Sequence, residues 1–183
     1  MWSIPVRIIS GSHKGRNILA PKNLPVRPTT DLAKESLFNI LNNHFDFNEI
    51  KVLDLFCGTG NISYEFASRG AMDISAVDKN YQCFTFVKKT SEILGFKNIK
   101  VFKSDVFSFI KHSQDPFDII FADPPYELDK IDIIPGLIFE KQLLNPNGWL
   151  IMEHSAQSNF QGTANLLERR NYGKVNFSIF EKE

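Results

Sequence analysis

The hydrophobic pattern of residues 51–183 predicts strands and helices in alternation. Short apolar runs are separated by stretches whose apolar residues recur with helical period. The expected strands are 52–56, 73–77, 99–103, 117–122 and 148–153, and the expected helices are 61–69, 81–94, 106–112 and 131–142. Two last strands, 166–172 and 174–180, are expected to form a hairpin around Gly173. This order predicts an α/β, Rossmann-like, mostly parallel sheet that ends in an antiparallel hairpin.

The first 45 residues follow a different pattern. Two short runs with apolar residues flank a turn that contains glycine and lysine, which predicts a β-hairpin with a basic tip over residues 6–20. A proline-rich connector follows over residues 21–28. Thr29 or Thr30 can then cap a helix that runs to about Asn43. We therefore expect a small N-terminal extension, residues 1–45, before a domain of residues 46–183.

Composition places the chain among ordinary globular proteins. It has 183 residues, of which 43% are hydrophobic and 23% are charged, enough for one domain with a small appendage. No run approaches the roughly 18 apolar residues of a membrane span, and the first residues do not resemble a leader, so we expect a cytoplasmic protein that binds no membrane. Cys57 and Cys83 are far apart and the four histidines are scattered, which predicts neither disulfides nor a metal site.

Charge is distributed unevenly although the net charge is zero. Residues 1–34 carry a net charge of +5 and the remainder carries −5. The basic residues of the first segment are Arg7, Lys14, Arg16, Lys22, Arg27 and Lys34. Such asymmetry is expected when one part of a chain meets a polyanion such as a nucleic acid. A solvated basic arm without a partner is the alternative.

The sequence Asp123-Pro124-Pro125-Tyr126 follows the apolar run 117–122 and is expected at the carboxyl end of a buried strand. The two prolines fix φ and donate no hydrogen bond, so a carboxylate and a carbonyl can face one small space. Two acceptors suit an amino group, and the tyrosine offers a flat surface on which a base can stack. The alternative is a strand end closed by a proline turn, with the aspartate as a cap.

A second motif lies in the first strand-to-helix turn of the alternating region. Asp54, Phe56, Gly58 and Gly60 surround a turn where glycine lets the backbone bend and approach a ligand. Asp78 ends the next expected strand, where nucleotide-binding sheets place the acid that binds ribose hydroxyls. Asp105, followed by Val106, comes after the third. With Asp123, these acids are expected along one edge of the sheet, where open α/β sheets bind ligands.

The nature of these residues also limits the choice of nucleotide. A nicotinamide dinucleotide would fit the glycines and Asp78, but the G-x-G-x-x-G pattern requires glycine where Ser63 stands. Asp54 beside the turn disfavours a polyanionic cofactor and favours a cationic one. S-adenosylmethionine carries a sulfonium and an amino group, so neighbouring carboxylates stabilise it by Coulomb attraction.

Together these residues resemble a known family. The pattern from Asp54 to Tyr126 is similar to class I S-adenosylmethionine-dependent methyltransferases that act on exocyclic amines. The segments 7–16, 27–31 and 35–39 are similar to the RsmD family, which methylates guanine N2 in small-subunit (16S) ribosomal RNA. The sequence departs from this family at three positions: Leu32 and Lys34 replace two common arginines, and Asp78 replaces the usual glutamate.

The resemblance implies a role for each motif. Asp123, Pro124 and Tyr126 would bind and activate the amine. The implied cofactor contacts, with S-adenosylhomocysteine as product, are Asp54, Phe56, Gly58, Gly60, Asp78, Asp105 and Val106. The implied RNA contacts are Arg7, Lys14, Arg16, Arg27, Thr29 and Thr30. The partner would be ribosomal RNA or a small-subunit assembly intermediate, and a monomer is expected.

Three alternatives stay open at this point. An adenine-N6 DNA methyltransferase can share the Asp-Pro-Pro-Tyr motif, although 183 residues leave little room for a target-recognition domain. A nicotinamide-dependent oxidoreductase is disfavoured by Ser63. A non-catalytic RNA-binding module is disfavoured by the set of four aspartates together with an aromatic residue.

Overall fold

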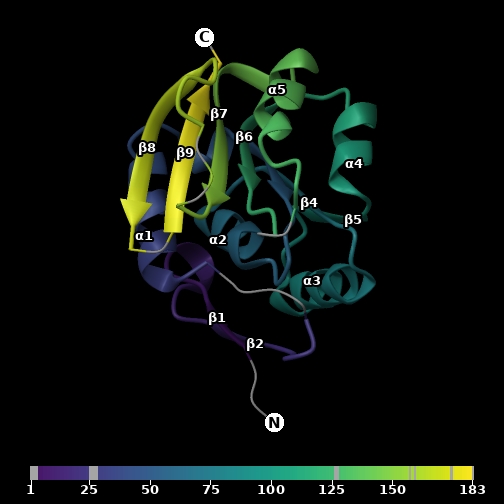
Figure 1. Cartoon of the computed structure of the whole chain (residues 1–183). Helices are drawn as coiled ribbons and strands as arrows, with labels where there is room; N and C mark the ends of the chain where they lie inside the picture. The colour runs from purple at the N-terminus through teal and green to yellow at the C-terminus, as the bar shows by residue number, and fades with distance from the viewer. Residues whose placement is uncertain are drawn as a thin grey trace.

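The computed structural model describes residues 4–24, 29–125, 128–156, 158, 160–173 and 175–182. Within these residues, seven strands form one sheet in the order β5-β4-β3-β6-β7-β9-β8, and β1 and β2 form a separate two-stranded sheet (Figure 1). Neighbouring strands from β5 to β7 are parallel, whereas β9 runs antiparallel to both β7 and β8. The predicted Rossmann-like sheet with an antiparallel C-terminal hairpin is confirmed.

The strands end close to the predicted positions. Their bounds are β1 Ile4–Arg7, β2 Asn17–Ala20, β3 Lys51–Leu55, β4 Asp73–Asp78, β5 Ile99–Lys103, β6 Phe117–Ala122, β7 Leu144–His154, β8 Leu166–Tyr172 and β9 Val175–Glu181. The largest difference is in β7, which begins four residues before the expected 148–153. Its first part pairs Leu144 with Phe117 across an irregularity in the register, so residues that resemble a turn in the sequence belong to the strand.

The helices follow the sequence pattern equally well. Their bounds are α1 Asp31–Leu41, α2 Asn61–Arg69, α3 Tyr81–Leu94, α4 Val106–His112 and α5 Ile133–Glu140, with short 3-10 helices η1 Gly11–His13 and η2 Phe47–Glu49. Caps explain several ends: the Thr30 hydroxyl accepts a hydrogen bond from the Ala33 N–H, and Asn80 caps α3 in the same way. Helix α5 is shorter than the predicted 131–142, and η2 was not predicted.

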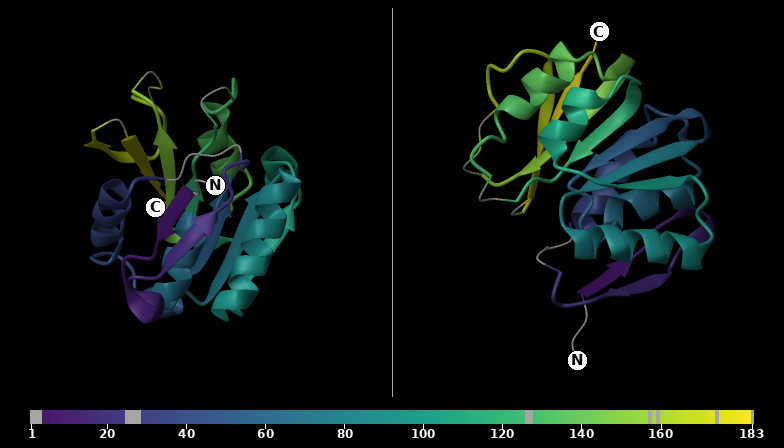
Figure 2. Two further views of the ribbon diagram at one scale, coloured as in Figure 1. Left: turned by 90° about the horizontal axis from the view of Figure 1, so that it is seen from below. Right: turned by 90° about the vertical axis from the view of Figure 1, so that its right-hand side faces the viewer.

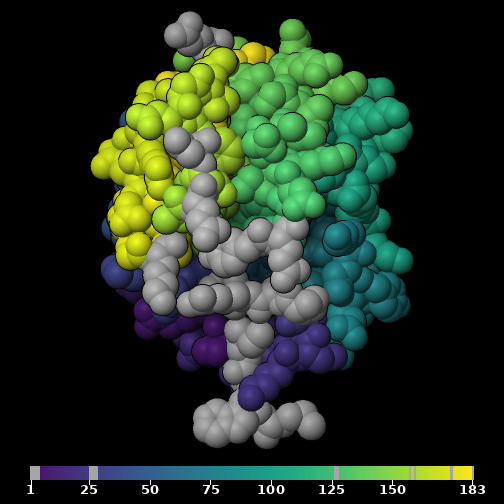
Figure 3. Space-filling model, viewed as in Figure 1, coloured from purple at the N-terminus to yellow at the C-terminus, as the bar shows by residue number. Residues whose placement is uncertain are grey.

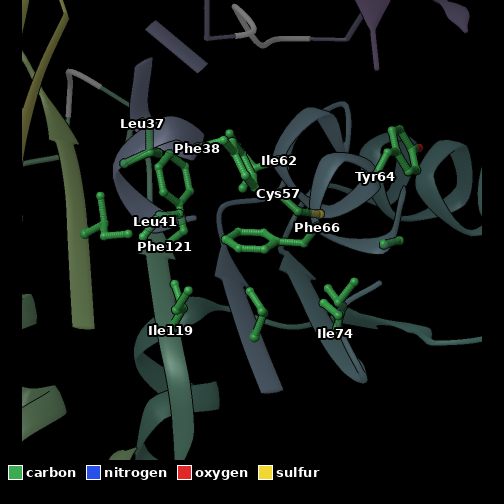
Figure 4. Close-up of a cluster of buried hydrophobic side chains, with 14 of the residues drawn as sticks. Leu37, Phe38, Leu41, Cys57, Ile62, Tyr64, Phe66, Ile74, Ile119 and Phe121 are labelled. Carbon is green, nitrogen blue, oxygen red and sulfur yellow. The ribbon is translucent and has the colours of Figure 1, made fainter. Parts of the chain in front are cut away.

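The helices cover both faces of the large sheet (Figure 2). Helices α1, α2 and α3 share one buried cluster with alternate residues of the strands, and α4 and α5 share another with the residues between them. Figure 4 shows Leu37 and Phe38 of α1 in one buried cluster with Phe66 of α2 and Phe121 of β6. Because α1 is part of this core, the described residues of the segment 1–45 do not form a core of their own. The predicted boundary between an N-terminal extension, residues 1–45, and a domain of residues 46–183 stays a prediction.

Helix α2 lies between the sheet and the N-terminal hairpin. Its residues from Asn61 to Ser68 are all buried, including four that are polar or charged. The hairpin residues Val6 and Ile8 are buried in the same cluster as Phe66. A helix can be buried on every side only when its polar groups find partners, and here the N-terminal segment supplies several of them.

No helix in the described ranges is long and apolar enough to cross a membrane.

Candidate active site

Four carboxylates lie at the carboxyl edge of four adjacent strands. Asp78 ends β4, Asp54 is in β3, Asp123 directly follows β6, and Glu153 is near the end of β7. Two positions before each acid, the strand has a residue that is buried in the cluster facing α1, α2 and α3. In the order Asp78, Asp54, Asp123 and Glu153, these residues are Ala76, Val52, Phe121 and Ile151. Since side chains alternate along a strand, all four acids extend toward that same face. The predicted gathering of acids therefore holds for Asp54, Asp78 and Asp123, and Glu153 joins them.

The turn between β3 and α2 approaches this edge closely. Phe56 has a φ of +65°, an unusual value for a residue with a Cβ, and Gly60 has a φ of +78°. A Cβ at Gly60 would lie 2.6 Å from the ring of Tyr64, so a larger residue would force this buried side chain to shift, and the positive φ also favours glycine. The Gly58 N–H donates a 2.9 Å hydrogen bond to Asp78 Oδ2. The turn is thereby fastened to the next strand.

Asp54 is buried beneath this turn. It is 2% exposed, and its Oδ2 accepts a 2.5 Å hydrogen bond from the Ser63 hydroxyl. The pKa of Asp54 is raised to about 7, chiefly because burial disfavours the charged form; hydrogen bonding to Ser63 opposes the rise and the charge of Asp78 adds to it. A cation placed near Asp54 would favour the ionised carboxylate and so lower this pKa.

Asp78 and Asp105 occupy different environments. The Asp78 carboxylate accepts hydrogen bonds from the N–H groups of Gly58 and Asn80, which fix its orientation at the rim of the site. Asp105 is exposed and caps α4 by accepting a bond from the Ser108 N–H, while Val106 is buried. Both follow strands at the same edge, as predicted, and their contact with a cofactor stays a prediction.

Asp123 and Pro124 follow β6 at the centre of the edge. The pKa of Asp123 is raised well above its ordinary value, first by burial and then by the negative charges of Glu153 and Asp54. Such a carboxyl is a stronger proton acceptor than an ordinary aspartate once it is ionised. Pro124 is buried and Pro125 is exposed. Tyr126, the predicted stacking residue, lies outside the described residues.

Glu153 received no functional role from the sequence motifs. It is 5% exposed, and its Oε2 accepts a 2.7 Å hydrogen bond from the Thr29 hydroxyl. The next residue, His154, extends to the opposite face, where its Nε2 lies 2.8 Å from the Ser178 hydroxyl. The signal was present in the sequence, because Glu153 follows an apolar run just as Asp78 and Asp123 do.

A chain of buried hydrogen bonds connects Thr29 to α2. Asn61, the first residue of α2, donates from Nδ2 to the Thr29 carbonyl at 3.0 Å, and its Oδ1 accepts from Lys34 Nζ at 2.7 Å. Lys34 Nζ also donates to the Arg7 carbonyl and lies 3.4 Å from Glu65 Oε2. Lys34 is one of the six basic residues of the N-terminal segment, but its side chain is fully buried, so its charge is not presented at the surface.

The six predicted RNA contacts are distributed over the N-terminal segment. Lys14 and Arg16 are exposed, and Thr30 is the exposed cap of α1. Arg7 forms a 3.0 Å ion pair with Asp31, whereas Thr29 is buried against Glu153. Arg27 lies outside the described residues. These six contacts stay predictions.

The basic hairpin tip is not adjacent to the acidic edge. Its turn packs on Ser68 and on the Leu94 carbonyl, at the C-terminal ends of α2 and α3, whereas the glycine-containing turn precedes α2. The nine residues of α2 separate the two by about 13 Å. The N-terminal hairpin, the middle of the chain and the C-terminal strands all appear on the face shown in Figure 3. An RNA held by Lys14 would have to extend over about the length of α2 to reach the acidic edge.

Comparisons with known proteins identify several that are similar to this chain in sequence or in fold. YlbH of Bacillus subtilis is 33% identical over 97% of this chain and 99% of its own length. The solved structure of yhhF from Escherichia coli is 26% identical, covers 98% of both chains and superposes with a TM-score of 0.86. A Thermus thermophilus structure described as "16S rRNA N2 G1207 methyltransferase (RsmC) in complex with AdoMet and Guanosine" covers 99% of this chain and 50% of its own, with 18% identity and a TM-score of 0.74. This last likeness shows that the two proteins share a fold.

The family follows from two matches. The family model described as "Conserved hypothetical protein 95" matches residues 6–181. "Ribosomal RNA small subunit methyltransferase D" of Escherichia coli is 33% identical over 81% of this chain and 71% of its own length. These matches confirm the resemblance inferred from the sequence motifs. The chain belongs to the ribosomal RNA small subunit methyltransferase D (RsmD) family.

Proposed function

We propose that this protein transfers a methyl group from S-adenosylmethionine to the exocyclic N2 amine of a guanine in small-subunit ribosomal RNA. The observation that carries the proposal is the position of Asp123 and Pro124, at the carboxyl end of β6 and beside the buried Asp54. The activity named for the Escherichia coli relative supports the substrate. The Thermus thermophilus relative of the same fold, whose description names AdoMet and guanosine, supports the pairing of this cofactor with guanine.

The site residues suit a cofactor that is cationic at one end and a nucleoside at the other. Asp54 would stabilise the sulfonium and amino groups by Coulomb attraction. The carboxylate of Asp78, oriented by two backbone N–H groups, would accept hydrogen bonds from the ribose hydroxyls. Phe56, Gly58 and Gly60 would let the backbone approach the ligand, and Asp105 with Val106 would contact the adenine. The positive end of the α2 dipole would favour the carboxylate of the methionine part.

The chain's own residues would then activate the amine. An exocyclic amine is a weak nucleophile because its lone pair is delocalised into the ring. With the Asp123 carboxylate and the Pro124 carbonyl accepting its two hydrogens, the positive charge that develops on nitrogen is stabilised. The N–C bond forms as the C–S bond breaks, and the nitrogen loses one proton to the Asp123 carboxylate or to water. Alignment of donor and acceptor supplies much of the acceleration.

The remaining expectations concern the substrate and the assembly. A guanine whose amine enters this pocket has to leave its stack, so flipping of the base or an open loop is expected. The basic N-terminal residues would bind phosphates. Recognition of an assembly intermediate, a monomeric state and a cytoplasmic location belong to the same proposal.

Tritium transfer tests the proposal directly. Labelled S-adenosylmethionine is incubated with small subunits from cells that lack this protein, with naked small-subunit RNA and with duplex DNA. The expected result is label in ribosomal RNA that nucleoside analysis identifies as N2-methylguanosine. Label in DNA as N6-methyladenine would instead support the DNA methyltransferase alternative. Label in no substrate, with cofactor bound, would contradict an RNA methyltransferase.

A further inference from the structure

Glu153 and Asp123 lie side by side at the ends of neighbouring strands. Ala122 of β6 pairs with Met152 of β7 in parallel register, so the next residues along the two strands are Asp123 and Glu153. Both extend toward the face covered by α1 and α2. The charge of Glu153 raises the pKa of Asp123, which agrees with this closeness. The pocket proposed for the amine thus has a second carboxylate at its wall.

The Glu153 carboxylate is held in place by residues of the N-terminal segment. Its Oε2 accepts the Thr29 hydroxyl proton at 2.7 Å, and both side chains are buried. The Thr29 carbonyl accepts from Asn61 Nδ2, and Asn61 Oδ1 in turn accepts from Lys34 Nζ. These hydrogen bonds fix the orientation of the Glu153 carboxylate. A site that distinguishes bases by their hydrogen-bond donors and acceptors requires such preorganisation.

The hydrogen-bond donors and acceptors of the bases indicate which base a second acceptor would favour. Guanine presents two adjacent donors, N1–H and the N2 amine, on its Watson–Crick edge. Adenine presents its N6 amine beside N1, which is an acceptor, and cytosine presents its N4 amine beside N3, also an acceptor. A carboxylate next to the amine site therefore favours guanine by accepting its N1–H, and it repels the lone pair on adenine N1 or cytosine N3.

We propose that Glu153 is a specificity-determining residue that accepts the guanine N1–H while Asp123 and Pro124 hold the N2 amine. The inference rests on the proposed function and names the group that selects guanine. Thr29 is the positioning residue that orients Glu153. The competing explanation is that Glu153 only joins β7 to the N-terminal segment.

A substrate pair that differs at N1 separates these two explanations. Small-subunit RNA is prepared with either guanosine or 2-aminopurine at the methylated position. 2-Aminopurine keeps the N2 amine, but its N1 carries no hydrogen. The ratio of kcat/KM for the two substrates is measured for the wild type, Glu153→Gln, Thr29→Val and the control Glu168→Gln. Glu168 is paired with Arg170 on β8, so the control makes the same chemical change away from the pocket.

The expected results are specific. The wild type and Glu168→Gln favour guanosine by about 10- to 100-fold, the discrimination of one hydrogen bond to a charged group. Glu153→Gln brings the ratio close to one, because an amide can also donate to the unprotonated N1, and Thr29→Val lowers the ratio in part. Thermal melting and S-adenosylmethionine affinity verify that each variant folds. Equal loss on both substrates in Glu153→Gln, or an unselective wild type, overturns the proposal. No methylation of guanosine by the wild type would instead contradict the proposed function.

Discussion

Gly11 in the turn of the N-terminal hairpin lies directly against Ser68 near the end of α2. A Cβ added to Gly11 would be 1.8 Å from the Ser68 carbonyl oxygen. The Ser68 hydroxyl donates to the Ser10 carbonyl at 2.6 Å and accepts from the His13 N–H at 2.9 Å. The turn is therefore docked on α2 and fixes how the hairpin covers this helix.

Replacing Gly11 by alanine is expected to destabilise the protein far more than replacing Gly15. Both glycines have φ near +80°, but no atom of the described residues lies within 4 Å of a Cβ at Gly15. Gly15→Ala should lower the free energy of unfolding by about 1–2 kcal/mol, the backbone effect alone. Gly11→Ala adds a backbone clash and should lower it by at least about 2 kcal/mol more. Urea denaturation measures both, and equal decreases would show that the turn is not docked as described.

Lys34 is expected to contribute to stability and not to RNA binding. Its buried ammonium contacts the Arg7 carbonyl, the Asn61 side chain and Glu65. Lys34→Met removes the donor to the Arg7 carbonyl and to Asn61 Oδ1, and it removes the positive charge that lies 3.4 Å from Glu65 Oε2. This change should lower the free energy of unfolding by about 3 kcal/mol. Lys88→Met, at an exposed lysine of α3, is the control and should have little effect. A Lys34→Met variant of wild-type stability with weakened RNA binding would reverse this assignment.

The pKa of Asp54 predicts how cofactor affinity depends on pH. With a pKa of about 7 in the folded protein, Asp54 is largely protonated at pH 6. A cationic ligand binds the ionised form better, so affinity for S-adenosylmethionine should rise with pH from about 5.5 to 7.5, by at most tenfold per pH unit for one proton. Titration calorimetry measures this slope, which should be smaller for S-adenosylhomocysteine and absent in Asp54→Asn. A slope unchanged in that variant would assign the proton to another group.

The same carboxyl affects stability in the opposite direction. Its pKa is higher in the folded protein than the ordinary 3.8, so the folded state holds the proton more tightly than the unfolded chain does. Between about pH 4 and 7 the unfolded chain releases this proton first. The contribution of Asp54 to the free energy of unfolding therefore falls as pH rises through that window. Comparison of the wild type with Asp54→Asn isolates this contribution.

Asp123 is expected to be required for transfer but not for cofactor binding. Asp123→Ala removes an acceptor of the amine hydrogens and should lower the rate by at least about 10²-fold, while S-adenosylmethionine still binds. Because burial and two neighbouring carboxylates raise the pKa of Asp123, the wild-type rate should increase with pH above the ordinary range of carboxyl groups. Asp115→Ala, at an exposed residue before β6, is the control. Wild-type turnover in Asp123→Ala would exclude the assigned role.

Local sequence signals predicted most of the fold. Helix α3 begins after the Asn80 cap and ends at Gly95, which has a φ of +73°, and both features are visible in the sequence. The acids Asp54, Asp78 and Asp123 were found because each accompanies the end of an apolar strand. The start of β7 was missed because Asn145, Pro146 and Asn147 resemble a turn, although they lie in the strand.

Contacts between distant parts of the chain could not be predicted in this way. Thr29 and Glu153 are 124 positions apart, and Lys34 and Asn61 are 27 apart. In the sequence, Lys34 resembles any other basic residue of the first segment. Its burial depends on how α1, α2 and the hairpin pack together, which no local pattern records. The residues whose structural roles could not be predicted from the sequence are thus those that connect the N-terminal segment to the sheet.

Reversing the charges of Lys14 and Arg16 tests whether the hairpin binds RNA. Both side chains are exposed and lie toward the end of α2 that is remote from the acids. The double variant Lys14→Glu, Arg16→Glu should weaken RNA binding and reduce the slope of log K against log salt by about 0.7–0.9 for each phosphate that the hairpin no longer binds. S-adenosylmethionine affinity should stay unchanged, because the acidic edge is about the length of α2 away.

The control for this variant makes the same charge change on another surface. Lys88→Glu, Lys89→Glu alters two exposed lysines of α3 and should affect RNA binding less. If the control weakens binding as much, the effect is one of net charge. If the hairpin variant binds RNA with the wild-type salt dependence, the hairpin tip is no RNA surface. Its basic residues would then be a solvated surface of a turn whose role is to cover α2.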